Sequence, residues 1–324
     1  MRENIFTENE LGCIRQKALE LGFMDVKFQA AVNPDIIWQK KYREYIKKGG
    51  HASMKYLENI APKFSLKKIY KPAQTLTVFS LPYIFDAAKE NQEIHSEFQG
   101  AWGKKYTAAK YCAGRDYHLV AKEKLEKIVS LPGIGAGRIV CDTTPLPERY
   151  YAALAGMGFI GKNAMLIHPE NGSYFFLAFI LFERSLPDEE RNKGAYNFEK
   201  QMSLFCGACD KCVKACPGGA LDGQGGLNAQ RCYSFWSIEN KLDIIQAKFK
   251  KLNSIFGCDI CQDVCPYNAK PVTTSLPDFK VSDLTKNILD GNIENQSLKG
   301  SCYERTGLKG LKRNLKYLQG YTDA

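Results

Sequence analysis

Eight cysteines in the C-terminal half of the chain have the spacing of iron–sulfur ligands, and they constrain the fold more than any other feature. Four form the run C-x2-C-x2-C-x3-C-P from Cys206 to Pro217, three form C-x2-C-x3-C-P from Cys258 to Pro266, and Cys232 lies between the runs. In bacterial ferredoxins the first spacing supplies three thiolates to one [4Fe-4S] cluster and a fourth to another. The sequence therefore predicts two [4Fe-4S] clusters held by eight cysteines.

The same crossing rule predicts how the ligands divide between the clusters. One cluster is expected on Cys206, Cys209, Cys212 and Cys265, and the other on Cys216, Cys232, Cys258 and Cys261. Disulfides and zinc sites are the alternatives, but zinc motifs rarely contain this triple with a Cys-Pro pair, and disulfide scaffolds suit short secreted chains. Isolated cysteines are most often small buried hydrophobic residues, so four receive no role: Cys13, Cys112, Cys141 and Cys302.

The composition is that of a globular protein with a basic surface. The 324 residues suffice for roughly two domains, with 44% hydrophobic and 25% charged residues. The formal charge of +10 falls to about +6 once eight thiolates and two oxidised clusters are counted. This balance favours nucleic acid or an anionic cofactor as partner, although solubility alone would also explain it. No apolar run approaches the roughly 18 residues of a membrane span, so we expect a cytoplasmic protein without a membrane partner.

The pattern of apolar residues divides the chain into three parts. Residues 1–195 are predicted to form an α/β unit, 196–270 a ferredoxin-like segment with two clusters, and 271–324 a helical, basic tail, which together give an α+β fold. A polar stretch over 187–200 precedes the cysteines. The elements expected in the first part are helices over 11–21 and 121–129, strands over 76–81 and 138–141, and a longer buried strand over 174–182.

A glycine pattern at Gly156, Gly158 and Gly161 matches the dinucleotide-binding fingerprint G-x-G-x-x-G. That fingerprint requires a strand before it and a helix after it. Residues 148–155 are instead a helix-like run rich in alanine and tyrosine. The sequence therefore argues against a Rossmann nicotinamide site.

Asp142 is the best candidate for proton chemistry in the first part. It directly follows the predicted strand over 138–141, and α/β proteins gather functional side chains at strand ends. A carboxyl group there could deliver a proton if burial raises its pKa. The alternative is a turn-forming or helix-capping aspartate. The four histidines are assigned no catalysis: His118 and His168 are interpreted as structural, and His51 and His95 as surface residues.

Several motifs in order resemble the epoxyqueuosine reductase family, which performs the last step of queuosine synthesis on tRNA. They are Gly-Arg-Asp-Tyr-His at 114–118, Asp-Thr-Thr-Pro-Leu-Pro-Glu-Arg at 142–149, Gly-Met-Gly-Phe-Ile-Gly-Lys-Asn at 156–163, and the segment 227–239 between the cysteine runs. Residues 300–314 near the end add to the resemblance. The similarity therefore covers nearly the whole chain.

The resemblance implies an oxidoreductase that converts epoxyqueuosine in tRNA to queuosine. It implies a base-off cobalamin in the first part, used as cob(I)alamin to attack the epoxide, with Asp142 as general acid. Electrons would come through the clusters from an external flavodoxin or ferredoxin type donor, and the enzyme would be a monomer. The cofactor contacts implied are Gly161, Lys162, Asn163, Ser234 and Phe235.

The chain departs from the family pattern in three places. Residues 61–66 stand where many members have an arginine followed by Asp-Pro, which leaves Lys63 as the substitute. The stretch 187–200 resembles an insertion, and the chain ends soon after Leu318, as in short members without C-terminal helical repeats. RNA is then expected on the basic tail, although that tail could equally be a solvated helix face. The tail residues predicted to contact RNA are Arg305, Lys309, Lys312 and Arg313.

Two other functions remain open from the sequence. A related corrinoid iron–sulfur reductase of the dehalogenase type would share the cofactors but act on a small organohalide. A non-catalytic electron carrier would use the clusters alone and the first part as a docking module.

Overall fold

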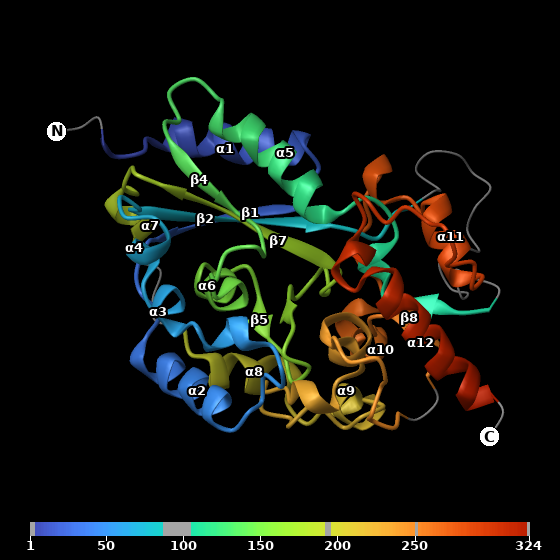
Figure 1. The fold of residues 1–324 in the computed structure, drawn as a ribbon. Coiled ribbons are helices and arrows are strands. Elements are labelled where there is room, and N and C mark those ends of the chain that lie inside the picture. The colour runs from blue at the N-terminus through green and yellow to red at the C-terminus, as the bar shows by residue number, and fades with distance from the viewer. Residues whose placement is uncertain (1–3, 87–104, 192–195, 250–251, 323–324) are drawn as a thin grey trace.

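The computed structural model describes residues 4–86, 105–191, 196–249 and 252–322, and its largest sheet has four strands (Figure 1). In spatial order these are β1 (Asp25–Ala30), β2 (Thr75–Pro82), β7 (Phe175–Phe182) and β4 (Gly137–Val140). All three pairings are antiparallel. The strands predicted over 76–81, 138–141 and 174–182 are confirmed, and the sheet is antiparallel although helices alternate with strands along the chain.

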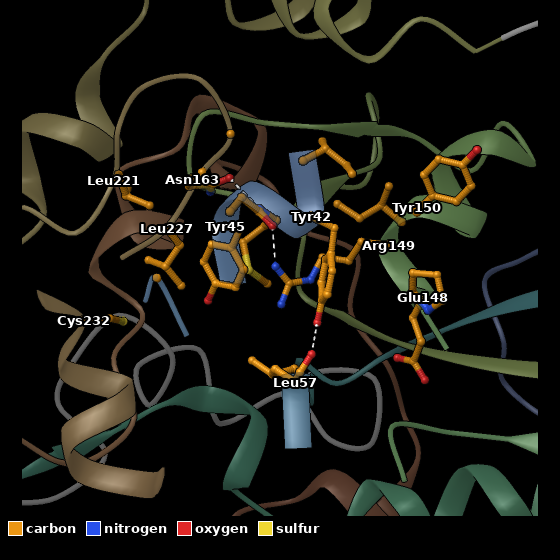
Figure 2. Close-up of a pocket in the computed structure, with 18 of the residues that line it drawn as sticks. Tyr42, Tyr45, Leu57, Glu148, Arg149, Tyr150, Asn163, Leu221, Leu227 and Cys232 are labelled. Atoms are coloured by element: carbon orange, nitrogen blue, oxygen red, sulfur yellow. Dashed lines mark hydrogen bonds between the residues drawn. The ribbon is translucent and has the colours of Figure 1, made fainter. Parts of the chain in front are cut away.

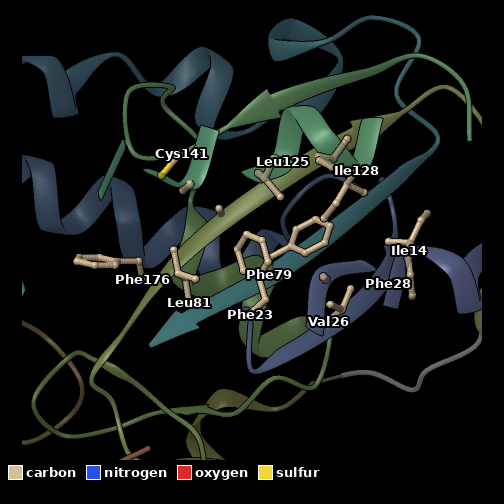
Figure 3. Close-up of a cluster of buried hydrophobic side chains, with 14 of the residues drawn as sticks. Ile14, Phe23, Val26, Phe28, Phe79, Leu81, Leu125, Ile128, Cys141 and Phe176 are labelled. Carbon is tan, nitrogen blue, oxygen red and sulfur yellow. The ribbon is translucent and has the colours of Figure 1, made fainter. Parts of the chain in front are cut away.

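Helices cover both faces of this sheet, which explains why its central strands, β2 and β7, are buried along nearly their whole length. On one face, α1 (Glu8–Glu20) and α5 (Tyr117–Val129) pack against Phe79 and Phe28, as Figure 3 shows through Ile14 and Leu125. On the other face, α6 (Glu148–Leu154) and α4 (Leu66–Ile69) pack on the remaining side chains of β2 and β7. With no face left to water, β7 is apolar throughout, and the polar residues of β2, Thr75, Thr77 and Ser80, are buried as well.

The helix predicted over 11–21 is confirmed as α1, and its start has a local cause. Thr7 accepts a hydrogen bond from the backbone N–H of Glu10, and the Glu10 carboxylate accepts one from the N–H of Thr7. This capping box satisfies two donors that the first turn leaves unpaired. The helix predicted over 121–129 is confirmed as the C-terminal part of α5.

Short elements connect these layers to the cysteine-rich segment. Below α6 in Figure 1 lie α2 (Ile36–Lys47), α3 (Ile60–Lys63) and α8 (Phe198–Cys206). The other helices are η2 (Lys55–Glu58), η4 (Lys110–Cys112), α7 (Asp188–Arg191), α9 (Lys211–Ala215), η5 (Ala229–Arg231), η6 (Phe235–Glu239), α10 (Ile260–Asp263), η7 (Pro266–Asn268), η8 (Pro277–Phe279), α11 (Asp283–Leu289), η9 (Cys302–Arg305) and α12 (Gly307–Thr322). None of the helices in the described ranges is long and apolar enough to cross a membrane.

Gly156, Gly158 and Gly161 lie between α6 and a small hairpin of β5 (Phe159–Ile160) and β6 (Leu166–Ile167). A helix therefore precedes the glycine pattern, and no helix follows it directly. A Cβ on Gly158 would lie 2.3 Å from the carbonyl oxygen of Ile167, so close packing of the hairpin requires glycine there. The pattern serves chain packing, in agreement with the argument against a dinucleotide site.

The third part of the chain packs against the other two rather than standing apart. Strand β8 (Ser254–Phe256) belongs to the second part and pairs in parallel with β3 (Thr107–Ala108) of the first part. A buried cluster joins both to the tail through Ile255, Leu289 and Leu311. The tail is thus held by a hydrophobic core as well as by polar contacts.

The side chain of Arg313 on α12 is hydrogen-bonded to main-chain carbonyl groups, so the prediction that it contacts RNA is wrong. Only 9% of the residue is exposed. Its guanidinium donates to the carbonyl oxygens of Asn240 at 2.6 Å, Trp236 at 2.8 Å and Leu242 at 3.1 Å, and to Asn314 Oδ1. These bonds use the donors that a phosphate would need. Sequence alone could not separate this buried arginine from the exposed basic residues around it.

Replacing Arg313 should destabilise the fold rather than weaken RNA binding alone. Arg313→Ala leaves several buried carbonyl groups without a donor, which we expect to cost roughly 3 kcal/mol or more. The midpoint of anaerobic thermal unfolding should fall by several degrees. Lys309→Ala on the same helix, whose side chain is 82% exposed, serves as the control and should leave the midpoint nearly unchanged. Equal midpoints for the two variants would refute the anchoring role.

Candidate functional site

The twelve cysteines, all within the described residues, are unpaired thiols, and eight of them form two groups. Burial and then the nearby Cys206 and Cys265 raise the pKa of the Cys212 thiol. In the second group, burial and then Cys232 and Cys216 raise the pKa of Cys258 to about 12. Thiols that repel one another in this way lie close together, as cluster ligands must. These repulsions act within the two predicted ligand sets, and the division of the ligands between the clusters stays a prediction. None of these cysteines forms a disulfide.

The hairpin after α6 fixes both groups to the sheet domain. The Lys162 ammonium donates to the carbonyl oxygens of Gly207 at 2.7 Å and Cys209 at 2.9 Å, in the loop of the first group. The amide nitrogen of Asn163 donates to the carbonyl oxygen of Cys261, 3.3 Å away in the second group. Main-chain geometry around the cysteines is therefore set from outside the cysteine-rich segment.

A cavity of about 2010 Å³ lies between the second cysteine group, α2 and the sheet. Cys216, Cys232, Cys258 and Cys261 all line it, whereas the four cysteines of the first group do not. In the view of Figure 2 the Arg149 guanidinium lies between the rings of Tyr42 and Tyr45 from α2, and Cys232 lies at the lower left; all four residues line the cavity. Pockets for small ligands usually measure about 300–1,000 Å³. This cavity has room for a large ligand beside the second cysteine group.

The predicted cofactor contacts fall into two sets. Asn163 and Ser234 line the cavity. Lys162 is directed to the first cysteine loop, so only its main chain is left for a cofactor. Phe235 is buried and packs edge-on against Trp236, and neither it nor Gly161 lines the cavity. Those three residues support their neighbours rather than offer side chains to a ligand.

Lys63, the substitute for the arginine of other members, does point to this space. It is buried, lines the cavity, and its ammonium lies 5.7 Å from the ring centroid of Tyr42. Burial lowers its pKa, and the negative charges of Glu148 and Asp142 act in the opposite direction. The Lys63 side chain thus lies where the predicted contact to a cofactor would require it.

Asp142 also lines the cavity, and its backbone is strained. Its φ angle of 50° lies in the left-handed region, which a non-glycine residue adopts only when its surroundings hold it there. The backbone N–H of Asp142 donates to Oε1 of Glu148 at 2.6 Å, and the Tyr117 hydroxyl donates to Oδ2 at 2.7 Å. The carboxylate is 60% exposed, toward the cavity. The strain and the two bonds fix its direction.

His118 completes a row of polar groups with Asp142 and Asp116. Its Nε2 lies 3.3 Å from Asp142 Oδ2 and its Nδ1 lies 2.6 Å from Asp116 Oδ1. Burial would lower the pKa of His118, but hydrogen bonds to Asp116 and Asp142 outweigh it and raise the pKa to about 9. The imidazole is therefore doubly protonated at neutral pH.

The condition under which Asp142 was expected to be an acid, a pKa raised by burial, is not met. Its pKa is lowered, first because His118 donates to the carboxylate, with Tyr117 adding a second bond, while burial acts against both. Glu148 has the opposite behaviour: burial and the charge of Asp142 raise its pKa to about 8. At neutral pH Glu148 is thus protonated and Asp142 is ionised. In the row of Asp116, His118 and Asp142, the proton that can be transferred is on His118.

Sequence reasoning misassigned one histidine and missed a contact of another. His118 was interpreted as structural, and its contact with Asp142 was not foreseen; its position two residues after Asp116 in Gly-Arg-Asp-Tyr-His was the available signal. His51, expected on the surface, is buried with Nε2 3.0 Å from Glu58 Oε1. His168 is structural as predicted, since its Nδ1 accepts the backbone N–H groups of residues 170 and 171. His95 lies outside the described residues.

Comparisons with known proteins agree with this arrangement. Residues 205–268 match the 4Fe-4S double cluster binding domain family. This segment contains all eight predicted ligands. An epoxyqueuosine reductase of Leadbetterella byssophila is 31% identical over 94% of this chain and 97% of that protein. One from Cyclobacterium marinum is 31% identical over 86% of this chain and 87% of that protein. The double [4Fe-4S] segment is confirmed.

Solved structures share the fold along almost the whole chain. Epoxyqueuosine reductase from Streptococcus thermophilus superposes with a TM-score of 0.76 at 26% identity, covering 98% of this chain and 82% of that one. An epoxyqueuosine reductase with a tRNA-Tyr epoxyqueuosine-modified stem loop gives 0.75 at 25% identity, covering 97% and 81%. The predicted α+β fold class, with its two-cluster segment, is confirmed by these similarities.

Alanine substitutions should reveal which cysteines share a cluster. Cys212→Ala and Cys265→Ala are each expected to lower iron from about eight to about four atoms per chain, and the double variant to lose no more than either alone. Cys261→Ala combined with Cys265→Ala should lose nearly all iron, because the two residues belong to different groups. Anaerobic iron analysis checks this, with Cys13→Ala, an exposed cysteine, as control. Additive loss in the Cys212 and Cys265 pair would contradict the division.

Glu148 should make stability depend on pH. Its pKa is about 8 in the fold against an ordinary 4.5, so the folded chain keeps a proton that the unfolded chain releases. Stability should therefore fall as pH rises from about 4.5 through 8 and stay level above. Glu148→Gln keeps an acceptor for Asp142 but removes this dependence. The denaturation midpoint of Glu148→Gln minus that of the wild type should increase as pH rises to 8 and stay constant above it. For the exposed Glu126→Gln the same difference should not change with pH. A constant difference would rule out the raised pKa.

Proposed function

Because this chain belongs to the epoxyqueuosine reductase family, we propose that it reduces the epoxide of epoxyqueuosine in tRNA to the alkene of queuosine. Removing the epoxide oxygen as water consumes two electrons and two protons. The observation that carries the proposal is that the cysteines of one cluster and the Asp142–His118 pair line or adjoin the same cavity. Electrons and protons can thus reach one substrate, which a plain electron carrier would not require.

The two clusters have different places in this scheme. The second cysteine group lines the cavity and the first does not, so we propose that electrons enter at the first cluster and leave at the second. The donor would be an external carrier of the flavodoxin or ferredoxin type. Since the proposed substrate is tRNA, we place the reaction in the cytoplasm.

We propose cobalamin as the second cofactor because the cavity fits it. The volume of about 2010 Å³ exceeds that of ordinary ligand pockets, and Asn163 and Ser234 line it beside the second cysteine group. Gly225, which also lines it, leaves main chain open to a flat ring. Lys63 and Arg149 add positive charge to the walls. When bound, cobalamin would supply a strongly nucleophilic reduced metal for opening the epoxide.

The proton for the departing oxygen would be stored on His118 and delivered through Asp142. His118 is protonated at neutral pH, with Asp116 balancing its charge at Nδ1. Asp142 is the member of the pair that faces the cavity. When a substrate excludes water, the ionised carboxylate loses solvation and its pKa rises, which draws the proton across the hydrogen bond. Tyr117 holds the carboxylate in place during the transfer.

The basic tail offers weaker RNA contacts than the sequence indicated. Arg305 pairs with Glu239 at 2.7 Å, Lys309 with Asp243 at 2.6 Å, and Lys312 with Glu294 at 2.8 Å. Each carboxylate competes with a phosphate for its cation. We retain these three as candidates, with Arg305 nearest the cavity because its guanidinium lies 5.5 Å from the Tyr56 ring centroid.

Substitutions in the proton row test this function directly. Asp142→Asn should lower the single-turnover rate on epoxyqueuosine stem-loop RNA by about 10²–10⁴, the usual contribution of a general acid. Iron and cobalt contents should stay at wild-type levels. The wild-type rate should fall as pH rises through about 9, where His118 loses its proton, and His118→Gln should be slower and lack that step. A full rate for Asp142→Asn with normal cofactor content would overturn the acid role.

A further inference from the structure

Helix α2 forms part of the cavity rim while remaining accessible from outside. None of its residues is buried. Ile37 is 64% exposed and also lines the cavity, as do Lys41 and Lys48. Tyr42 and Tyr45 point inward from the same helix (Figure 2). Helix α2 therefore offers side chains both to the cavity and to the outer surface.

The helix has an aromatic face toward the cavity and a mostly basic face away from it, where one carboxylate, Glu44, lies between Lys40 and Lys47 and pairs with Lys48 at 3.9 Å. Helical spacing places Trp38, Tyr42 and Tyr45 on the inner side and Lys40 and Lys47 on the opposite side. Within the described parts of the chain, no carboxylate lies within ion-pair distance of Lys40 or Lys47. Lys309 and Lys312 of the tail differ, since each of these two has a carboxylate partner. The outer face of α2 is thus free to attract an anion.

Apolar and basic residues occur together at the start of the helix. Ile36 is 62% exposed beside Ile37 at 64%, and both line the cavity. Proteins that bind single-stranded nucleic acid combine cations for the backbone with flat or apolar side chains against unstacked bases. A helix of 12 residues is about 18 Å long and so can follow several nucleotides.

From this arrangement we propose that the outer face of α2, with Lys40 and Lys47 at its centre, binds the phosphate backbone of the substrate RNA. Ile36 and Ile37 contact nucleotides next to the one that enters the cavity. This inference rests on the proposed function, and it places the principal RNA surface on α2 instead of the C-terminal tail. An acidic electron carrier is the competing partner, but it would not need apolar residues at the rim of the substrate cavity.

The test compares three double variants: Lys40→Gln/Lys47→Gln on α2, Lys309→Gln/Lys312→Gln on the tail, and Lys122→Gln/Lys127→Gln on α5 as a control. Glutamine preserves helix propensity, so folding should be unaffected. The α5 pair is exposed and lies on the far side of the sheet from α2 (Figure 1). Binding of an unmodified tRNA anticodon stem-loop to the holoenzyme is measured by fluorescence anisotropy over a range of salt concentrations.

We expect the α2 variant to bind RNA about ten-fold or more weakly at low salt. The slope of log affinity against log salt should fall by about 2, one unit for each phosphate contact removed. The α5 variant should match the wild type. An unchanged slope in the α2 variant, or a larger loss in the tail variant, would overturn the α2 surface.

Two further readings separate this inference from the proposed function. If the α2 variant binds RNA normally but is reduced more slowly by a flavodoxin, the surface serves the electron donor and the RNA assignment is wrong. If the wild type reduces epoxyqueuosine RNA while the α2 variant keeps full RNA affinity, only the surface fails. A wild type that shows no salt-dependent RNA affinity would overturn both.

Discussion

The hydrogen bonds from Lys162 and Asn163 to the cysteine loops hold the redox segment against the rest of the protein. Both residues lie in the short β5–β6 hairpin, and their partners are main-chain carbonyls of Gly207, Cys209 and Cys261. An electron must cross from cluster to substrate over a short distance, so the position of one segment relative to the other determines whether chemistry occurs. A hairpin braced by buried α6 is rigid enough for this purpose.

Much of the fold and of the cluster site could be predicted from the sequence, because both depend on patterns of neighbouring residues. Cysteine spacing determines ligands within one loop, and apolar periodicity identifies elements such as α1, α5 and β7. The antiparallel pairing of the sheet was not accessible, since it depends on contacts between residues about a hundred positions apart. Arg313 was misplaced for a related reason, because the carbonyl groups that allow its burial lie about seventy positions away. His51 was also misplaced, although its partner Glu58 is only seven positions away.

The acid site shows why residue type alone did not establish the proton chemistry. Asp142 was identified by its place after a strand, but its protonation state depends on His118 and Tyr117, which reach it across 24 and 25 positions of sequence. The two carboxyl groups of Asp142 and Glu148 differ because one receives donors at its side chain and the other is buried near a negative charge. Environment, rather than sequence identity, assigns each its role.

The depth of the cavity also imposes an order on the working enzyme. Its inner wall is formed by the second cysteine group, and α2 stands at its rim. Under the proposed assignments, a cofactor seated against the cysteines would enter before RNA lies across α2, and bound RNA would then block its exit. Under the proposed assignment, the cofactor is retained through successive turnovers while each RNA arrives and departs, so loading and catalysis are events on separate timescales.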